Sequence, residues 1–462
     1  MNVDEGGKNM GPVEKIVAEQ REFFRRGTTR PVAHRREALK KLRGALARYE
    51  EEIMEALRLD LGKSPSESYM TELAMVYSEI KTALRGVNKW SRPQRKGQSL
   101  ATFPSVNTVH SEPYGVVLIM APWNYPFYLT LAPLVGAVAA GNCVVLKGSR
   151  NSPHSSGLIK RIVDETFGAE YIHCVDPDVA YEEVLAPRYD YILFTGSPGV
   201  GKKIMKVASE NLTPVTLELG GKSPCFVDET ADIALAAKRI AWGKFLNAGQ
   251  TCISVDYVLV HRQVKGDFLE ALKGEIEKNY PMDESFPKII NKKHFQRLKA
   301  LMGTEEYWGG AVDEAANKIG PTIFPNSNFS REIMKEEIFG PILPIIEYDH
   351  LDEAMARVRE GEKPLACYLF SRSGEHQKKI LEGLSFGGGC INDVILHISN
   401  DKLPFGGVGN SGMGHYHGRY GFDTFSHQKA VVKSATFLDL PFRYKPFNDK
   451  KLALLRKLYG GK

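Results

Sequence analysis

The sequence lacks the features that mark several classes of protein. Its 462 residues contain only six cysteines, and no two of them form a CxxC pair. This scatter argues against a disulfide scaffold and against a structural zinc site, and it is typical of a reducing compartment. The cysteines are Cys143, Cys174, Cys225, Cys252, Cys367 and Cys390.

Long uninterrupted apolar runs are also absent. The longest apolar stretch, residues 116–146, is broken by three prolines and by a Gly-Asn pair. It therefore predicts buried strands and helices rather than a membrane span. Residues 1–11 are polar and carry two acids, so no signal peptide is expected. These absences predict a cytoplasmic protein with no integral membrane segment.

Neither sign of charge dominates the composition. The 61 basic and 55 acidic residues leave a formal charge of +6, which is too small a surplus for the dense basic patch of a nucleic-acid binder. The one basic segment that stands out is the tail KKLALLRKLYGGK, from residue 450. A solvated surface helix and a helix that touches an anionic membrane are both compatible with this pattern.

What is present predicts an α/β protein of two or three structural units. The first 95 residues have helical spacing of their apolar positions. After them, short runs rich in β-formers alternate with longer helical patterns, as in parallel sheets flanked by helices. One set contains VVLIM, CVVLK, YILFTG and VTLELGG, and a second set after Gly220 contains PCFV, YVLV, LPIIEY and ACYLF.

A candidate nucleophile lies in the segment NAGQTC, which ends at Cys252. A helical pattern ends near Phe245 and a strand begins near Val255, so the thiol occupies a Gly-containing connection between rigid elements. A free thiol has a pKa of about 8.5 and needs help to ionise. The other cysteines are interpreted as small buried hydrophobes, and for Cys390, which follows three glycines, an approach to a site is the alternative.

Two further residues are candidates for acid–base and oxyanion chemistry. Glu218 is flanked by leucines at the end of an apolar strand, where partial burial would raise its pKa toward the range of a general base. The alternative is a salt-bridged glutamate. Asn124, in the loop PWNYP, is stiffened by prolines and has an amide suited to an oxyanion. The alternative there is an ordinary turn asparagine.

A cofactor loop is suggested by FTGSPGVG at residues 194–201, between a strand and a helical pattern. Its glycines would let the backbone approach a pyrophosphate at a helix N-terminus. Because the spacing departs from GxGxxG, the motif alone is a weak dinucleotide signal.

These segments, in this order, resemble the aldehyde dehydrogenase superfamily. The resemblance spans roughly residues 21–433 and includes PWNYP, FTGSPGVG, LELGGK, GQTC, EEIFGP and PFGGVGNSGMG. NAGQTCISVDYVLV and GMGHYHGRYGFDTFSHQKAVV are most similar to the class 3 branch, which takes aromatic and medium- to long-chain aliphatic aldehydes. The resemblance implies oxidation of such aldehydes to carboxylic acids with NAD⁺ or NADP⁺, without a metal.

The same resemblance implies roles for individual residues. Cys252 would form the thiohemiacetal and thioester, Asn124 and the Cys252 backbone N–H would hold the oxyanion, and Glu218 would activate water. Glu337 and Phe339 would position the nicotinamide ribose and ring. The remaining cofactor contacts would be Lys147, Gly196, Ser197, Val200, Gly201, Leu219 and Gly220.

The implied fold has a Rossmann-type cofactor domain, an α/β catalytic domain and a small β oligomerisation arm. We expect the NAD(P)-binding domain at 1–95 and 115–219 and the catalytic domain at 220–415. The arm is expected at 96–114 and 416–440, followed by a tail at 441–462. Class 3 resemblance favours a homodimer.

One position departs from the family pattern. The lysine that ends the VVLK strand is usually followed by Pro-Ser-Glu, but here Lys147 precedes Gly-Ser-Arg150. Exchanging that glutamate for arginine reverses the local charge and supplies a partner for a 2′-phosphate. We therefore hypothesise that the enzyme accepts NADP⁺. The alternative is that Arg150 points to solvent and NAD⁺ is favoured.

Other functions remain open at this point. An acylating or semialdehyde-type relative is one alternative, although Glu218 favours the hydrolytic route because only that route needs a water-activating base. A catalytically silent structural or binding homologue is another. The physiological aldehyde is not specified, and loose candidates for the substrate tunnel are Tyr69, Met70, Tyr77 and Trp242.

Overall fold

The computed structural model describes residues 10–460, which form two compact units. The larger unit holds the described residues up to Trp90 together with Pro113–His427, and the smaller unit holds Ser91–Glu112 and the chain from Gln428 onward. Residues 416–427, expected in the arm, therefore lie in the larger unit. The reason is packing: α15 (Gly418–Thr424) contacts α5 and α6, and Phe422 and Phe425 are buried.

The N-terminal part is helical, as the spacing of its apolar residues predicts. Gly62, with φ of +70°, ends one of these helices in the left-handed conformation that glycine adopts readily. A π-helical turn, η1, lies between the short helix α4 and the last helix of this part, α5. The elements are α1 (Pro12–Arg25), α2 (Val32–Arg48), α3 (Glu50–Leu61), α4 (Pro65–Ser68), η1 (Tyr69–Leu73) and α5 (Ala74–Trp90).

The first sheet has six strands in the order β17-β7-β6-β3-β4-β5. All neighbours are parallel except β17 with β7. The strands β3 and β4 are buried along their whole length, as expected when helices cover both faces. The strands are β3 (Val116–Met120), β4 (Cys143–Lys147), β5 (Ile172–Val175), β6 (Tyr191–Gly196), β7 (Val215–Leu219) and β17 (Gly412–Met413).

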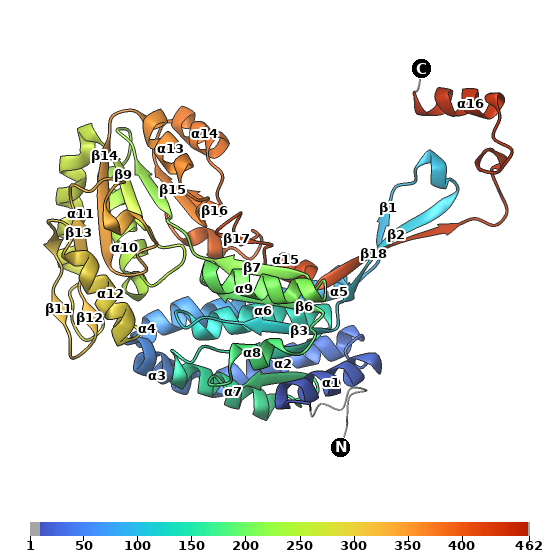
Figure 1. Cartoon of the computed structure of the whole chain (residues 1–462), viewed down its shortest axis with the longest axis horizontal. Helices are drawn as coiled ribbons and strands as arrows, with labels where there is room; N and C mark the ends of the chain where they lie inside the picture. Colours follow the sequence, from blue (N-terminus) through green and yellow to red (C-terminus); the bar gives the residue numbers. More distant parts are fainter. Residues whose placement is uncertain (1–9, 461–462) are drawn as a thin grey trace. The chain divides into compact units, whose positions relative to one another are not determined.

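The helices that connect these strands are α6 (Pro126–Ala140), α7 (Pro153–Thr166), α8 (Tyr181–Leu185) and α9 (Pro198–Glu210). Every residue of α6 is buried, because α2, α5 and α15 pack around it as well as the sheet. A helix that is apolar on all sides is expected in such a position. Figure 1 shows α6 and α9 beside the strands β3 and β6 of this sheet.

The second sheet has seven strands in the order β10-β13-β14-β9-β8-β15-β16, parallel except for β10 with β13. The strands are β8 (Pro224–Val227), β9 (Tyr257–His261), β10 (Trp308–Gly309), β13 (Thr322–Phe324), β14 (Ile342–Tyr348), β15 (Ala366–Phe370) and β16 (Gly388–Ile391). The helices are α10 (Ile233–Phe245), α11 (Lys265–Asn279), α12 (Lys292–Met302), α13 (Leu351–Glu360) and α14 (Gly374–Gly383). A small ribbon pairs β11 (Val312–Asp313) with β12 (Lys318–Ile319).

Short 3₁₀ segments occupy several of the loops. They are η2 (Leu100–Thr102), η3 (Leu246–Gly249), η4 (Arg262–Val264), η5 (Glu332–Met334), η6 (Leu396–Ser399) and η7 (Pro441–Arg443).

Opposite edges of the two sheets contribute to one crevice. In the first sheet the chain runs β3-β4-β5 in one direction and then returns to place β6 on the other side of β3. Ligands of such sheets bind at this reversal, beyond the carboxyl ends of the strands. Asn124 and Ser197 follow β3 and β6 there. In the second sheet, Cys252 and Glu337 lie in the loops that precede the amino ends of β9 and β14.

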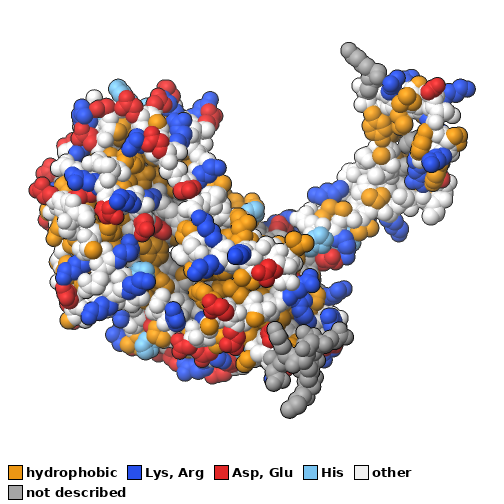
Figure 2. All heavy atoms as spheres, viewed as in Figure 1, with side chains coloured by type: hydrophobic (Ala, Val, Ile, Leu, Met, Phe, Trp, Pro, Cys, Tyr) orange, Lys and Arg blue, Asp and Glu red, His pale blue; other side chains and the backbone are white. Residues whose placement is uncertain are grey.

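The smaller unit contains a three-stranded sheet and a terminal helix. Its elements are β1 (Gln94–Lys96), β2 (Ser105–Pro113), β18 (Ser426–Ser434) and α16 (Asp449–Tyr459). Leu452, Leu454 and Leu458 of α16 are exposed, and in Figure 2 hydrophobic side chains lie beside Lys and Arg on this unit. Across the described residues, no helix combines the length and apolar character needed to span a bilayer.

The contact between α6 and α15 predicts a position-specific effect on stability. A Cβ added at Gly136 would lie 3.1 Å from the backbone of Gly421, whereas one at Gly157 of α7 would meet nothing within 4 Å. We expect Gly136→Leu to lower the unfolding free energy by about 1–3 kcal/mol through overpacking. Gly157→Leu should leave it unchanged or raise it by up to about 1 kcal/mol through helix propensity. Thermal unfolding followed by circular dichroism tests this, and equal effects of the two changes would contradict it.

Candidate active site

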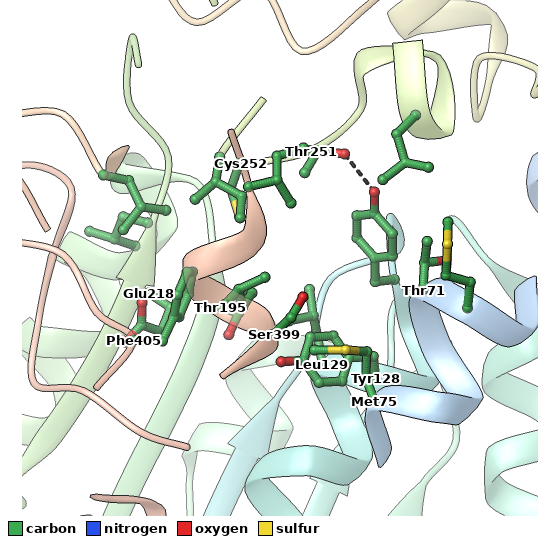
Figure 3. Close-up of a pocket in the computed structure, with 18 of the residues that line it drawn as sticks. Thr71, Met75, Tyr128, Leu129, Thr195, Glu218, Thr251, Cys252, Ser399 and Phe405 are labelled. Carbon is green, nitrogen blue, oxygen red and sulfur yellow. Dashed lines mark hydrogen bonds between the residues drawn. The ribbon is translucent and has the colours of Figure 1, made fainter. Parts of the chain in front are cut away.

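Two cavities of different character meet at Cys252. A groove of about 710 Å³ runs between the two sheets, and a narrower apolar pocket of about 100 Å³ lies on the other side of the thiol. Both cavities are lined by Leu129, Thr195, Glu218, Leu219 and Cys252. Figure 3 shows Cys252, Glu218 and Thr195 around the apolar pocket. The volume of the groove is in the range of small-molecule and cofactor sites, and the lining of the pocket suits an apolar group.

The loop that carries Cys252 is tightly constrained. After α10 ends at Phe245, Asn247, Ala248 and Gly249 all have positive φ. At Gly249 a side chain has no room, because a Cβ would lie 2.3 Å from the carbonyl oxygen of Gly340. Such strain is stored where the surroundings fix the backbone, often at functional sites.

The residue before the thiol is also fixed. The hydroxyls of Thr251 and Tyr125 are hydrogen-bonded at 2.6 Å, the contact drawn as a dashed line in Figure 3. Burial raises the pKa of the Cys252 thiol to about 12, and the carboxylates of Glu337 and Glu218 add to this shift. The thiol of the cofactor-free protein is therefore mainly protonated at neutral pH.

Glu218 is a buried carboxylate without a partner. It projects from β7 with 2% of its surface exposed, and neither carboxylate oxygen has a hydrogen-bond partner among the described residues. Burial raises its pKa well above the ordinary value. The structure therefore contradicts the alternative of a salt-bridged glutamate. An unpaired acid that lines a cavity beside a thiol has the environment of a general base.

Asn124 is held beside the Cys252 loop through its side chain and through its backbone. Its side-chain amide nitrogen donates to the backbone carbonyl oxygen of Gln250 at 3.0 Å. Its backbone carbonyl oxygen accepts from the Asn247 side-chain amide at 2.9 Å and from the Lys63 ammonium at 3.2 Å. Because an amide group has two N–H donors, one remains available to a ligand. The side chain is 2% exposed, so its position is well defined.

The groove fits a dinucleotide. Of the predicted cofactor contacts, it is lined by Gly196, Ser197, Leu219, Gly220, Glu337 and Phe339. Ser197 is the N-cap of α9 and its side chain makes no cap hydrogen bond, which leaves the start of that helix open to an anion. At Gly220 a Cβ would lie 2.0 Å from a Glu337 carboxylate oxygen, so the absent side chain makes space for that acid. These features suit the phosphates and the ribose of a nicotinamide cofactor.

The backbone on both sides of Glu337, an acid that lines the groove, is held by the ion pair of Lys222 and Asp256. The Lys222 ammonium bonds to the Asp256 carboxylate at 2.5 Å and to the carbonyl oxygen of Glu336 at 2.9 Å. The adjacent Glu337 is buried, and this burial raises its pKa to about 8. Phe339 has a φ of +51° and packs edge-on against Trp123 with ring centroids 5.4 Å apart.

Four predicted cofactor residues do not line the groove. Val200 and Gly201 lie in the first turn of α9, directly behind it. The Lys147 ammonium is turned to backbone carbonyls, donating to Gly148 at 3.0 Å and to Pro177 at 2.6 Å. Arg150 is exposed in the turn after β4.

The apolar pocket contains residues that the sequence did not single out. Met70 and Trp242 line it as loosely predicted, whereas Tyr69 and Tyr77 do not. Its other lining residues come from elements far apart in the chain, so no local pattern could have identified them. They include Met75, Tyr128, Leu129, Ile395, Ile398 and Phe405.

The first sheet has a dinucleotide-sized groove at its strand reversal, and a thiol lies in that groove. These two features define a nicotinamide-dependent oxidoreductase that works through a covalent intermediate. Comparison with known proteins makes the class specific. The model of the aldehyde dehydrogenase family matches residues 5–431. The chain belongs to this family, and it is an NAD(P)-dependent aldehyde dehydrogenase with the α/β fold expected from the sequence.

Individual relatives confirm the resemblance to the class 3 branch. Human aldehyde dehydrogenase family 3 member B1 is 43% identical over 455 residues, covering 96% of this chain and 97% of that protein. The dimeric NADP-preferring aldehyde dehydrogenase of Canis lupus familiaris is 40% identical, covering 95% of this chain and 98% of that protein. A structure described as the substrate-bound state of Staphylococcus aureus AldH is similar with a TM-score of 0.94 and 43% identity, covering 97% of this chain and 100% of the other.

The raised pKa of Cys252 predicts how the thiol reacts with pH. A thiol reacts as its thiolate, so alkylation by iodoacetamide in the cofactor-free protein should accelerate with pH and reach no plateau below pH 9. At pH 9, Glu337→Gln should increase the rate, because it removes a carboxylate that opposes the thiolate. Mass spectrometry of the Cys252 peptide measures the rate, with Cys252→Ala as control. A plateau near pH 7 would contradict this prediction.

Proposed function

We propose that this protein oxidises aldehydes with aromatic or medium- to long-chain aliphatic groups to carboxylic acids through a thioester on Cys252. The observation that carries the proposal is the position of Cys252 between an apolar pocket and a dinucleotide-sized groove. An aldehyde whose chain occupies the pocket presents its carbonyl carbon to the thiol. The same carbon is then accessible from the groove, where hydride must leave.

Addition to the carbonyl is the first step. Once the thiol has lost its proton to solvent, the Cys252 thiolate sulfur forms a bond to the carbonyl carbon, the carbon–oxygen π bond breaks, and the carbonyl oxygen becomes an oxyanion. The free N–H of the Asn124 amide and the backbone N–H of Cys252 are the donors that would stabilise it. Pre-positioned donors of this kind contribute about 10²–10³-fold to a rate.

The second step removes hydride and leaves a thioester. When bound in the groove, the oxidised nicotinamide cofactor supplies the acceptor for that hydride. Glu337 and Phe339 would position it, and the open start of α9 would hold its phosphates.

Hydrolysis of the thioester completes the cycle. Glu218 takes a proton from water, the water oxygen attacks the thioester carbon, and the carbon–sulfur bond breaks to release the acid and the thiolate. The absence of a partner for its carboxylate oxygens supports this role. It also favours the hydrolytic route over the acylating alternative. The presence of thiol, amide and acid at one cavity argues against a catalytically silent homologue.

Cofactor choice is a separate proposal. Arg150 is exposed after β4 and makes no hydrogen bond or ion pair with another described side chain, so its guanidinium is available to a 2′-phosphate. The name of the canine relative, which prefers NADP, supports acceptance of NADP⁺ by this chain.

Assembly and location are also proposed. The first and second sheets would form the NAD(P)-binding and catalytic domains, and the smaller unit would pair two copies into a homodimer. The exposed apolar residues of that unit and the dimeric canine relative support this.

The six free cysteines support a cytoplasmic location. Contact of α16 with a membrane surface is the alternative for the tail.

Substitution of the thiol and of the acid should separate the two halves of the reaction. With hexanal and NAD⁺, Cys252→Ala should abolish formation of reduced cofactor. Glu218→Gln should leave a burst of about one equivalent per site followed by turnover about 10²–10⁴-fold slower, because water is no longer deprotonated. Stopped-flow absorbance of the reduced cofactor measures both. Turnover by Cys252→Ala, or a slowed burst with normal turnover in Glu218→Gln, would overturn the assigned roles.

The Arg150 proposal has its own test. Arg150→Glu should weaken NADP⁺ binding by about 10-fold or more while leaving NAD⁺ binding within about twofold, because a bidentate phosphate contact is replaced by repulsion. Fluorescence titration of both cofactors measures the ratio. Lys238→Glu, an exposed charge reversal on α10, is the matched control and should change neither. If Arg150→Glu left the ratio of the NADP⁺ and NAD⁺ dissociation constants unchanged, Arg150 would not contact the 2′-phosphate.

A further inference from the structure

A buried ion pair lies directly behind the oxyanion amide. The Lys63 ammonium and the Glu72 carboxylate are 2.8 Å apart, and both side chains are 0% exposed. Neither residue lines the groove or the apolar pocket. Replacing such a pair by apolar residues is often neutral for stability, so a buried pair need not be present for stability alone.

Glu72 fixes the start of α6. One carboxylate oxygen accepts from the backbone N–H groups of Phe127 and Tyr128, at 2.9 and 3.1 Å. These are donors of the first helical turn, which a negative charge satisfies and stabilises. The residues that follow, Tyr128 and Leu129, line the apolar pocket.

Lys63 fixes the loop just before that helix. Its ammonium donates to the backbone carbonyl oxygen of Asn124 at 3.2 Å and lies 3.9 Å from the centre of the Tyr125 ring. Both contacts are to residues of the PWNYP loop, and the second is of the cation–π type. The ion pair thus holds two consecutive segments of the chain. Lys63 holds the PWNYP loop at Asn124, and Glu72 holds the start of α6 at Phe127.

The same N-terminal segment also reaches the nucleophile loop. Glu67 accepts from the backbone N–H of Asn247 at 2.7 Å. The side-chain amide of Asn247 then donates to the backbone carbonyl oxygens of Asn124 and Gln250, at 2.9 and 3.1 Å. The amide of Asn124 completes the ring by donating to the carbonyl of Gln250. The network therefore connects the oxyanion amide to the loop that carries Cys252.

We propose that Lys63 and Glu72 are positioning residues that set the orientation of the Asn124 amide toward the oxyanion. This inference rests on the proposed function, in which Asn124 holds the oxyanion. The pair touches neither substrate nor cofactor. It acts by anchoring the backbone carbonyl of Asn124 and the first turn of α6, which fixes the backbone from which the side-chain amide points one N–H to the developing charge. The π-helical turn η1 (Tyr69–Leu73) places Glu72 inward while Met70 and Thr71 line the pocket.

The main test variant is Lys63→Met combined with Glu72→Gln. It removes both charges together, and the glutamine oxygen still accepts from the first turn of α6, so no lone charge is left buried. We expect kcat/KM for hexanal to fall about 10- to 100-fold, as for a small misplacement of a catalytic group. The KM for NAD⁺ should stay within about twofold. Lys63→Arg, which keeps the charge but changes the geometry, should show a smaller loss in the same direction.

A double-mutant cycle with Asn124→Ala distinguishes positioning from general destabilisation. If the pair acts through Asn124, the Lys63→Met/Glu72→Gln change should have no more than a twofold further effect in the Asn124→Ala background. Arg21→Met/Asp190→Asn is the matched control. Asp190 likewise binds a cation and a backbone N–H, that of Val116, but neither Arg21 nor Asp190 lines the groove or the apolar pocket. Its kcat/KM per folded molecule should be unchanged.

Each outcome has a defined meaning. The positioning role would be overturned if Lys63→Met/Glu72→Gln lowered kcat/KM by the same factor in the wild-type and Asn124→Ala backgrounds. It would also be overturned if Lys63→Met/Glu72→Gln kept the wild-type kcat/KM. Wild-type kcat/KM in Asn124→Ala alone would overturn the oxyanion role in the proposed function, and the positioning role with it. A large loss in Asn124→Ala with additive effects of the pair would overturn only the present inference.

Discussion

The chain passes from the first sheet to the second through residues 220–223, between the end of β7 and the start of β8, and the backbone there has little room. A Cβ at Gly220 would meet the Glu337 carboxylate at 2.0 Å, and one at Gly221 would approach the backbone of Leu365 at 3.2 Å. This short crossing fixes the distance between the sheets. It places Glu218, the last-but-one residue of β7, beside loops that belong to the other sheet.

That constraint explains why acid, thiol and amide converge although they are far apart in the chain. The first sheet contributes its carboxyl edge, with Asn124 after β3 and Glu218 on β7. The second contributes its amino edge, with Cys252 before β9 and Glu337 before β14. A groove between two such edges has rigid strands behind every loop, which limits how far a catalytic group moves.

The electrostatics of the groove follow from the same burial. Burial raises the pKa of Cys252, Glu218 and Glu337 alike, because each charge would be negative and poorly solvated. The positive charge of an oxidised nicotinamide cofactor, held by Glu337 and Phe339 as proposed, would oppose these shifts and so would favour the thiolate of Cys252.

Much of the architecture could be predicted from the sequence. Apolar runs that begin at Val116, Cys143, Tyr191 and Val215 are strands with those starting residues. The helix before the thiol ends at Phe245 as its pattern predicts. These features are local, since periodicity and glycine position determine them. Family motifs supplied the rest of the site, including Glu337, because short motifs mark where the backbone must approach a ligand.

Features set by tertiary contacts could not be predicted in this way. Lys147 is expected among the cofactor contacts from the family resemblance, and its ammonium donates to the backbone carbonyls of Gly148 and Pro177, the second of which only the folded chain brings near. Residues 416–427 resembled part of the arm until burial of Phe422 and Phe425 assigned them to the larger unit. The lining of the apolar pocket is likewise scattered over separate elements.

The N-terminal helices illustrate the same limit in a functional way. In the sequence they show only the helical spacing of their apolar positions, and nothing in it marks Lys63 or Glu72. In the structure these two charges are fully buried at the back of the Asn124 loop. Burying a charge is costly unless it is paired and hydrogen-bonded, and here the partners are the opposite charge, the backbone of that loop and of the first turn of α6, and the Tyr125 ring. The N-terminal region is therefore part of the catalytic framework, because it determines the direction in which an amide on another element points.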